Sequence, residues 1–265
     1  MSLAMGVAVR PTPVTRANPV AKLAAALVIT VVLLLSVDWV SAGVALALEL
    51  VALPLSGLAP RELLRRIAPV WVTAAPAGLV TMLLGEDSGT VLVDLGPLEV
   101  SDGSVAAGVA IALRVLAVGL PGVLLLVSTD PTDLADALAQ RVRLPHRFVL
   151  GALAGLRMVG LMVVEWRTLS LARRARGVGD GDGLLGSARV LAGQSFALLV
   201  LALRRGARLA VAMEARGFGA PVERTWARPS RFAPRDVGLV AGAAFVAAIS
   251  ATAAALAGTW SFVLA

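Results

Sequence analysis

Three aspartates near the middle of the chain are spaced three residues apart: Asp130, Asp133 and Asp136. On a helix this spacing places the carboxylates on one face, where they could hold a divalent cation, as in a membrane-embedded transferase. The same residues also suit a helix start, because Asp130 can cap a helix that opens with proline, and acidic residues favour its first turn. We favour the helix start and expect neither a metal site nor a cofactor here.

Other residue types that carry catalysis are scarce. The chain has no cysteine, a single histidine, His146, and a single lysine, Lys22, which stands between alanine and leucine rather than in a phosphate-binding loop. Asp180 and Asp182, in a glycine-rich stretch, offer too few oxygens for calcium, which takes roughly 6–8. The sequence therefore predicts no catalytic residues and a protein that is not an enzyme.

Two short motifs repeat, Ala175-Arg176-Gly177 and Ala215-Arg216-Gly217, each at the end of a predicted long helix. Glycine supplies the left-handed conformation that closes a helix, and the helix dipole favours a cation in the last turn. Capping alone would explain one copy. Two copies favour docking, because an arginine at a helix tip presents five donors to the carboxylates or carbonyls of a partner.

The elements that position these motifs belong to a membrane protein. Hydrophobic residues make up 58% of the 265 residues, charged residues 15%, and the mean hydropathy is +0.86; soluble domains have roughly 45–50% and 25%. The net charge of +7 does not indicate a nucleic-acid partner, since tyrosine is absent and aromatic residues are only 4%. The lipid bilayer is the expected environment.

Stretches with few or no charges predict five transmembrane helices, because a span needs about 20 apolar residues. Their approximate limits are 18–37, 40–57, 67–84, 104–127 and 237–260. The first two form a hairpin that turns near Asp38 and Trp39. We therefore expect an all-α integral membrane protein with five transmembrane helices and long cytoplasmic coupling helices.

Basic residues, which stay on the cytoplasmic side, set the orientation. Arg10, Arg16 and Lys22 place the N-terminus inside, and residues 86–103, with five acids and no basic residue, fall outside. Residues 128–235 carry 17 of the 24 basic residues and are predicted to be cytoplasmic.

The apolar stretches 148–164 and 190–203 inside that region are therefore read as cytoplasmic helices. Both are short for spans, and treating them as spans would place five arginines outside. The expected organisation is residues 1–127 with four transmembrane helices, 128–235 as the coupling region, and 236–265 as the last transmembrane helix.

Two charges fall inside predicted spans, Glu49 and Arg114. Both lie about ten residues from the outer end of their helix, and charges at the midplane usually face the bundle interior and find partners. We predict that the two form an intramembrane pair.

The chain resembles the T components of energy-coupling factor importers, including the cobalt- and biotin-importer membrane subunits. The paired Ala-Arg-Gly motifs carry the resemblance, together with the segment 213–219, the helix start at 128–138, and Ala112-Leu113-Arg114. The basic pair Arg173 and Arg174 beside the first motif departs from the pattern and leaves open which arginine makes the main contact.

The resemblance implies that Arg176 and Arg216 dock into grooves on two ATP-hydrolysing subunits of the ABC type. It also implies a separate substrate-binding membrane S component that takes up a vitamin or a metal. Two other classes remain open, a self-sufficient secondary carrier and the transferase considered above. Neither the transported substrate nor the stoichiometry follows from the sequence.

Overall fold

A computed structural model describes residues 12–36, 38–85, 90–94, 99–177, 183–220 and 225–260. Within these residues the chain is almost entirely helical, as predicted, and it divides into two compact units. Unit 1 comprises Met1–Ala137 and Ser230–Ala265, and unit 2 comprises Leu138–Pro229.

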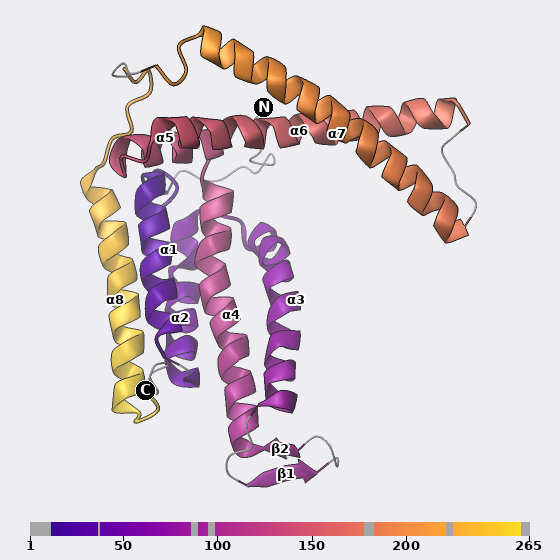
Figure 1. Ribbon diagram of the computed structural model, residues 1–265. Coiled ribbons are helices and arrows are strands. Elements are labelled where there is room, and N and C mark those ends of the chain that lie inside the picture. Colours follow the sequence, from indigo (N-terminus) through magenta and orange to yellow (C-terminus); the bar gives the residue numbers. More distant parts are fainter. Residues whose placement is uncertain are drawn as a thin grey trace. The chain divides into compact units, whose positions relative to one another are not determined.

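Unit 1 is a bundle of five long or moderately long helices that run side by side (Figure 1). They are α1 (Pro19–Leu34), α2 (Trp39–Ala52) extended by the 3₁₀ turn η1 (Leu53–Ser56), α3 (Pro60–Leu84), α4 (Asp102–Ser128) and α8 (Pro234–Leu256). An antiparallel pair of short strands, β1 (Val91–Asp94) and β2 (Glu99–Ser101), joins α3 to α4. All five predicted spans are therefore helices of this bundle.

The predicted turn of the first hairpin is confirmed at Asp38, which caps α2. Its carboxylate accepts hydrogen bonds from the Ser41 backbone N–H at 2.6 Å and from the Ser36 hydroxyl at 2.6 Å. A carboxylate at the start of a helix satisfies free N–H groups and faces the positive end of the helix dipole. These local bonds end one helix and begin the next within a few residues.

Small residues allow the bundle helices to approach closely. A Cβ atom added to Gly78 of α3 would lie 2.7 Å from the Gly108 carbonyl oxygen of α4, and the reverse substitution meets the same limit. Ala42, Ala45 and Ala117 are fully buried. Large side chains such as Leu126 and Val51, each 78% exposed, point outward, as expected when lipid is the surrounding solvent.

Five described helices are long and apolar enough to cross a membrane, but they are not the five of the prediction. They are α2 with its 3₁₀ extension, α3, α4, α8 and α6 (His146–Ala175), whereas α1, with 16 residues, is shorter than the others. The expectation that the apolar stretch of α6 is too short for a span is wrong. Its helix runs for 30 residues and contains a window of mean hydropathy 1.8.

One end of unit 1 gathers the beginnings of α1 and α8 and the end of α4. Asn18, which caps α1, donates its backbone N–H to Asp236 in the first turn of α8 at 2.7 Å. Lys22 of α1 donates to the carbonyl oxygen of Ser128, the last residue of α4, at 2.8 Å. The chain therefore leaves the bundle after α4 and returns to it in α8 at the same end.

Unit 2 consists mainly of two long helices, α6 and α7 (Gly183–Ala215), of 30 and 33 residues. They correspond to the two predicted long helices that end in the Ala-Arg-Gly motifs. The boundary between the units follows Ala137, within α5 (Pro131–Arg141) and ten residues beyond the predicted limit at 127. Where the membrane begins and ends along the chain stays a prediction.

Candidate functional site

The first motif ends α6 as the sequence predicts. Arg176 is the C-cap residue, and Gly177 follows with a φ of 73°, in the left-handed region. The Gly177 N–H donates to the Arg174 carbonyl oxygen at 2.9 Å, which satisfies one of the free carbonyls at the helix end. Residues 178–182, including Asp180 and Asp182, lie outside the described residues.

The second motif ends α7 with the same geometry and one additional bond. Gly217 has a φ of 79°, its N–H donates to Glu214 at 2.9 Å, and the Phe218 N–H donates to Met213 at 3.0 Å. This pair of bonds is the Schellman motif. Residues other than glycine adopt its left-handed backbone conformation only at a cost in free energy. Gly177 and Gly217 therefore each end a helix immediately after its arginine and fix the direction of the chain that follows.

All six motif residues are exposed: Ala175, Arg176, Gly177, Ala215, Arg216 and Gly217. Neither the Arg176 nor the Arg216 guanidinium forms an ion pair with any described residue. An unpaired guanidinium at a fixed helix end retains its donors for a partner.

Three side-chain interactions show that α6 and α7 run antiparallel where they meet. Arg205 of α7 forms an ion pair with Glu165 of α6, and Gln194 donates to the Trp166 carbonyl oxygen at 2.8 Å. Arg173, near the end of α6, donates to the Val190 carbonyl oxygen near the start of α7 at 3.1 Å. The C-terminal ends of α6 and α7 consequently lie at opposite ends of the helix pair, as Figure 1 also shows, and each of these ends carries an arginine.

The separation of the tips follows from helix length. A helix of 30 residues, the length of α6, spans about 45 Å at roughly 1.5 Å per residue. Because the second tip lies near the beginning of α6, the two arginines are separated by a distance on the order of 40 Å. One small partner surface cannot contact both, but two separate subunits can.

The question left open by the basic pair beside the first motif is answered in part by Arg173. Its guanidinium is used inside unit 2, where it bonds to α7 and lies against Gly193. Arg174 and Arg176 are exposed. Arg173 is thus engaged inside unit 2, whereas the predicted docking residue Arg176 is exposed.

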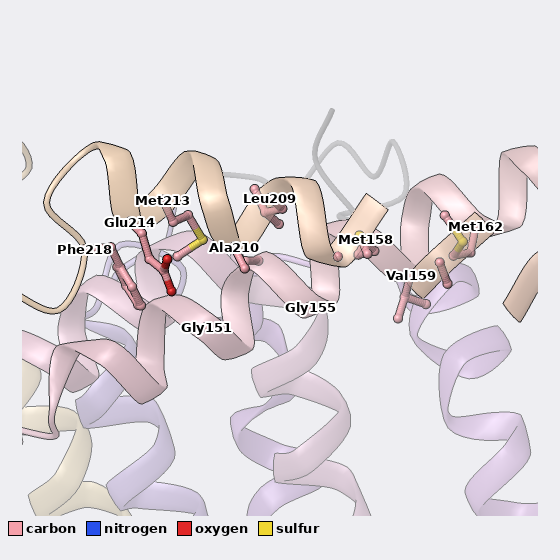
Figure 2. A pocket seen from close by; sticks show the side chains of 13 residues that line it. Gly151, Gly155, Met158, Val159, Met162, Leu209, Ala210, Met213, Glu214 and Phe218 are labelled. Atoms are coloured by element: carbon pink, nitrogen blue, oxygen red, sulfur yellow. The ribbon is translucent and has the colours of Figure 1, made fainter. Parts of the chain in front are cut away.

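An apolar groove of about 540 Å³ lies between the first half of α6 and the second half of α7. Figure 2 shows Met158 and Met162 of α6 and Met213 of α7 along it, with Gly151 and Gly155 on the α6 side. Methionine side chains adapt to different partner shapes, and glycine lets a partner approach the backbone. Sequence reasoning missed this groove, whose signal was the spacing of glycines and methionines along one face of α6.

Glu49 and Arg114, the predicted intramembrane pair, are not brought together, and that expectation is corrected. Arg114 Nη2 donates to the carbonyl oxygen of Ser36, at the turn that Asp38 organises. Side chains on a helix lean toward its N-terminus, so Arg114 reaches back along α4 toward the end where that turn lies. Neither carboxylate oxygen of Glu49 has a hydrogen-bond partner in the described part of the chain.

Glu49 instead lines a cavity of about 500 Å³ in unit 1, between α1, α2, α4 and α8. The lining is mostly apolar, with Gly238 and Gly242 of α8 on one side. Glu49 is 6% exposed. A buried carboxylate without a donor is costly, so this residue is an unusual feature of the bundle interior.

The three spaced aspartates occur at a helix start, as favoured above. Asp130, immediately before α5, accepts a hydrogen bond at 2.8 Å from the backbone N–H of Thr132 in the first turn of that helix. No cluster of three or more metal-ligating side chains occurs in the described ranges. His146 is the first residue of α6.

Comparison with known proteins identifies the class. A family model described as cobalt transport protein, CbiQ, matches residues 11–226. The energy-coupling factor transporter transmembrane protein EcfT of Brevibacillus brevis is 30% identical over 234 residues, which cover 85% of this chain and 88% of that protein. EcfT of Heliobacterium modesticaldum is 28% identical over 233 residues, 85% and 87% of the two chains.

A third relative has a different name. A putative ABC transporter ATP-binding protein of Bifidobacterium longum is 29% identical over 218 residues, which cover 79% of this chain but 27% of that longer protein.

The fold and these similarities define a multi-pass, all-α membrane subunit of a transporter. The chain belongs to the CbiQ family, the transmembrane T components of energy-coupling factor transporters.

Proposed function

We propose that this chain couples ATP hydrolysis by two ABC ATPase subunits to the movement of a substrate-binding membrane S component during uptake of a vitamin or a metal. The chain itself hydrolyses nothing: it transmits motion. Binding of ATP closes the two ATPases, the docked tips of α6 and α7 move with them, and the S component is reoriented.

The observation that carries this proposal is the pair of arginine tips. Arg176 and Arg216 are exposed, lack ion-pair partners among the described residues, and end antiparallel helices. Two identical docking elements separated on the order of 40 Å suit two equivalent partners better than one. The helix pair α6 and α7 joins the contact with one ATPase to the contact with the other. When the two ATPases approach each other, the pair rotates or bends.

The Bifidobacterium longum relative supports association with an ATP-binding partner. A region similar to this chain occupies about a quarter of that protein, whose name describes an ABC transporter ATP-binding protein. Fusion of two parts into one chain is consistent with parts that act together.

The connections at one end of unit 1 support a cytoplasmic location for residues 128–235. Since α4 ends where α8 begins, the intervening chain crosses the membrane an even number of times or not at all. Crossing by α6 would therefore require crossing by α7, which does not qualify as a span within its described length. We propose five spans, α1 to α4 and α8, with the N-terminus in the cytoplasm.

The groove between α6 and α7 is the surface we assign to the S component. Only 6% of the most apolar window of α6 is buried within this chain, so its apolar face needs another cover. An apolar helix of a second membrane protein would bury that face and fit between the methionines.

A secondary carrier is the second candidate, and the cavity beside Glu49 favours it. Cavities of roughly 300–1,000 Å³ with a few polar groups are typical small-molecule sites. The two candidates separate cleanly: a carrier transports substrate when this chain is reconstituted alone, whereas a coupling subunit does not.

The test is purification of the tagged chain from its native membrane in mild detergent, followed by identification of what copurifies. We expect two ATPase subunits and one small membrane protein, with ATP hydrolysis that depends on this chain. A chain that purifies alone and transports substrate without ATP would contradict the proposal.

A further inference from the structure

Lys22 is a buried charge whose partners are backbone and hydroxyl oxygens. It is 6% exposed, and its ammonium group donates to the Thr15 carbonyl at 3.1 Å, the Ser128 carbonyl at 2.8 Å and the Ser128 hydroxyl at 3.2 Å. Three acceptors use all three donors of the ammonium group. The Ser128 carbonyl is the terminal one of α4, which has no partner within its own helix.

A second buried group joins α1 to α8 a turn away. Asp236 is 1% exposed and accepts the Asn18 N–H at 2.7 Å and the Ala233 N–H at 2.6 Å. The Asn18 amide in turn donates to the Ser230 hydroxyl at 2.8 Å and the Arg231 carbonyl at 3.0 Å.

These bonds hold the ends of unit 1 from which the chain leaves toward unit 2 and at which it returns. The outgoing connection follows Ser128 and reaches the unit boundary after Ala137, and the returning connection begins at Ser230. Both are therefore bonded to the first turn of α1, the one through Lys22 and the other through Asn18.

We propose that Lys22 is a positioning residue for energy coupling: it clamps the end of α4 to α1, so that displacement of the coupling region is transmitted to the bundle and changes the spacing of its helices. This inference rests on the proposed function. Hydrogen bonds from a charged donor are stronger than neutral ones, and in a buried site they resist the separation of the groups they join. Without the clamp, movement of α5 would be absorbed by fraying of the last turn of α4.

Spectroscopy of the whole complex tests this proposal. The chain contains no cysteine, so cysteine pairs can be introduced and spin-labelled before assembly with the ATPases and S component in nanodiscs. Val72 and Phe245, both exposed, report on the bundle, and Leu171 and Leu203, also exposed, report on unit 2. Distances in each pair are measured without nucleotide and with ATP and vanadate.

In the unsubstituted complex we expect nucleotide to change both distances. In Lys22→Met, which keeps length and removes every donor, the unit 2 distance should still change, while the equilibrium constant for the bundle change falls about tenfold or more. Arg235→Met is the matched control: it removes a basic residue that is exposed near the same end, and both changes should remain. Assembly with the ATPases should be equal in all variants.

Each outcome decides a different claim. If no ATPase assembles with the unsubstituted chain, the proposed function fails. If ATPases assemble but the bundle distance is insensitive to nucleotide, or Lys22→Met responds fully, the clamp is overturned while the proposed function stands. Should Lys22→Met not assemble, Lys22→Gln replaces it; two donors on a shorter side chain predict a partial loss, and a full response overturns the clamp.

Discussion

Asp236 accepts a hydrogen bond from the backbone N–H of Asn18, across 218 positions of the sequence. Because each residue stands at the start of a helix, α1 and α8 begin at the same end of the bundle and run parallel. The bond from Lys22 to Ser128 places the end of α4 there too, so the chain between α4 and α8 must return to the side from which it left.

The first prediction concerns that topology. Cysteines at Thr90, in the connection between α3 and α4, and at Ala188 in α7 are both exposed, and in the proposed five-span topology they should be labelled from opposite sides of the membrane. The measurement is labelling of intact cells with a membrane-impermeant maleimide, with lysed cells as the control. Labelling of both positions from outside would show that α6 spans the membrane.

The second prediction concerns the intramembrane charges. Arg114→Gln should destabilise the protein by about 1.5–3 kcal/mol, the range for a hydrogen bond to a charged group, whereas Glu49→Gln should be neutral or stabilising because no partner is lost. Thermal unfolding in detergent measures both. The double variant should show the sum of the two effects, since the residues share no contact. A strong interaction term would restore the pairing that the structure does not show.

The third prediction addresses the groove between α6 and α7. A Cβ atom added at Gly155 would meet no atom within 4 Å, so we expect Gly155→Leu to extend into the groove without disturbing α6. Gly160→Leu is the matched control, because it adds the same side chain to the same helix at a position where a Cβ atom also meets no atom within 4 Å, but which does not line the groove. We expect the S component to be lost from the purified complex in the first variant and kept in the second. Equal retention would exclude the groove as its binding surface.

Local features of the fold were predictable from the sequence because short-range chemistry decides them. Asp38 interrupts two apolar runs and caps the second helix, Asp130 precedes a proline, and Gly217 follows an arginine at the end of a helix. Each forms its bonds within a few residues, so spacing alone identifies it.

Contacts between helices were not predictable in the same way. The partner of Arg114 depends on the axial offset of α1 and α4 and on the direction in which a long side chain leans. The sequence suggested Glu49 instead, because both residues lie about equally far from the outer ends of their helices. Arg173 contacts α7 only because the helices run antiparallel. The positions of the arginines likewise did not predict the length of α6, because an exposed helix can continue through arginine residues.

The most direct test of the account is the affinity of the chain for its ATPases when the helix tips are changed. Arg176→Glu and Arg216→Glu should each weaken binding by about 2 kcal/mol, roughly thirtyfold, and together should abolish it, because interface arginines are frequent hot spots and reversal adds repulsion. Arg204→Glu, which reverses an exposed arginine in the middle of α7, should bind like the unsubstituted chain. Binding is measured by titrating the ATPase pair onto the chain held in nanodiscs. Unchanged affinity of the double variant would contradict the central claim that the arginine-tipped ends of α6 and α7 are the docking elements.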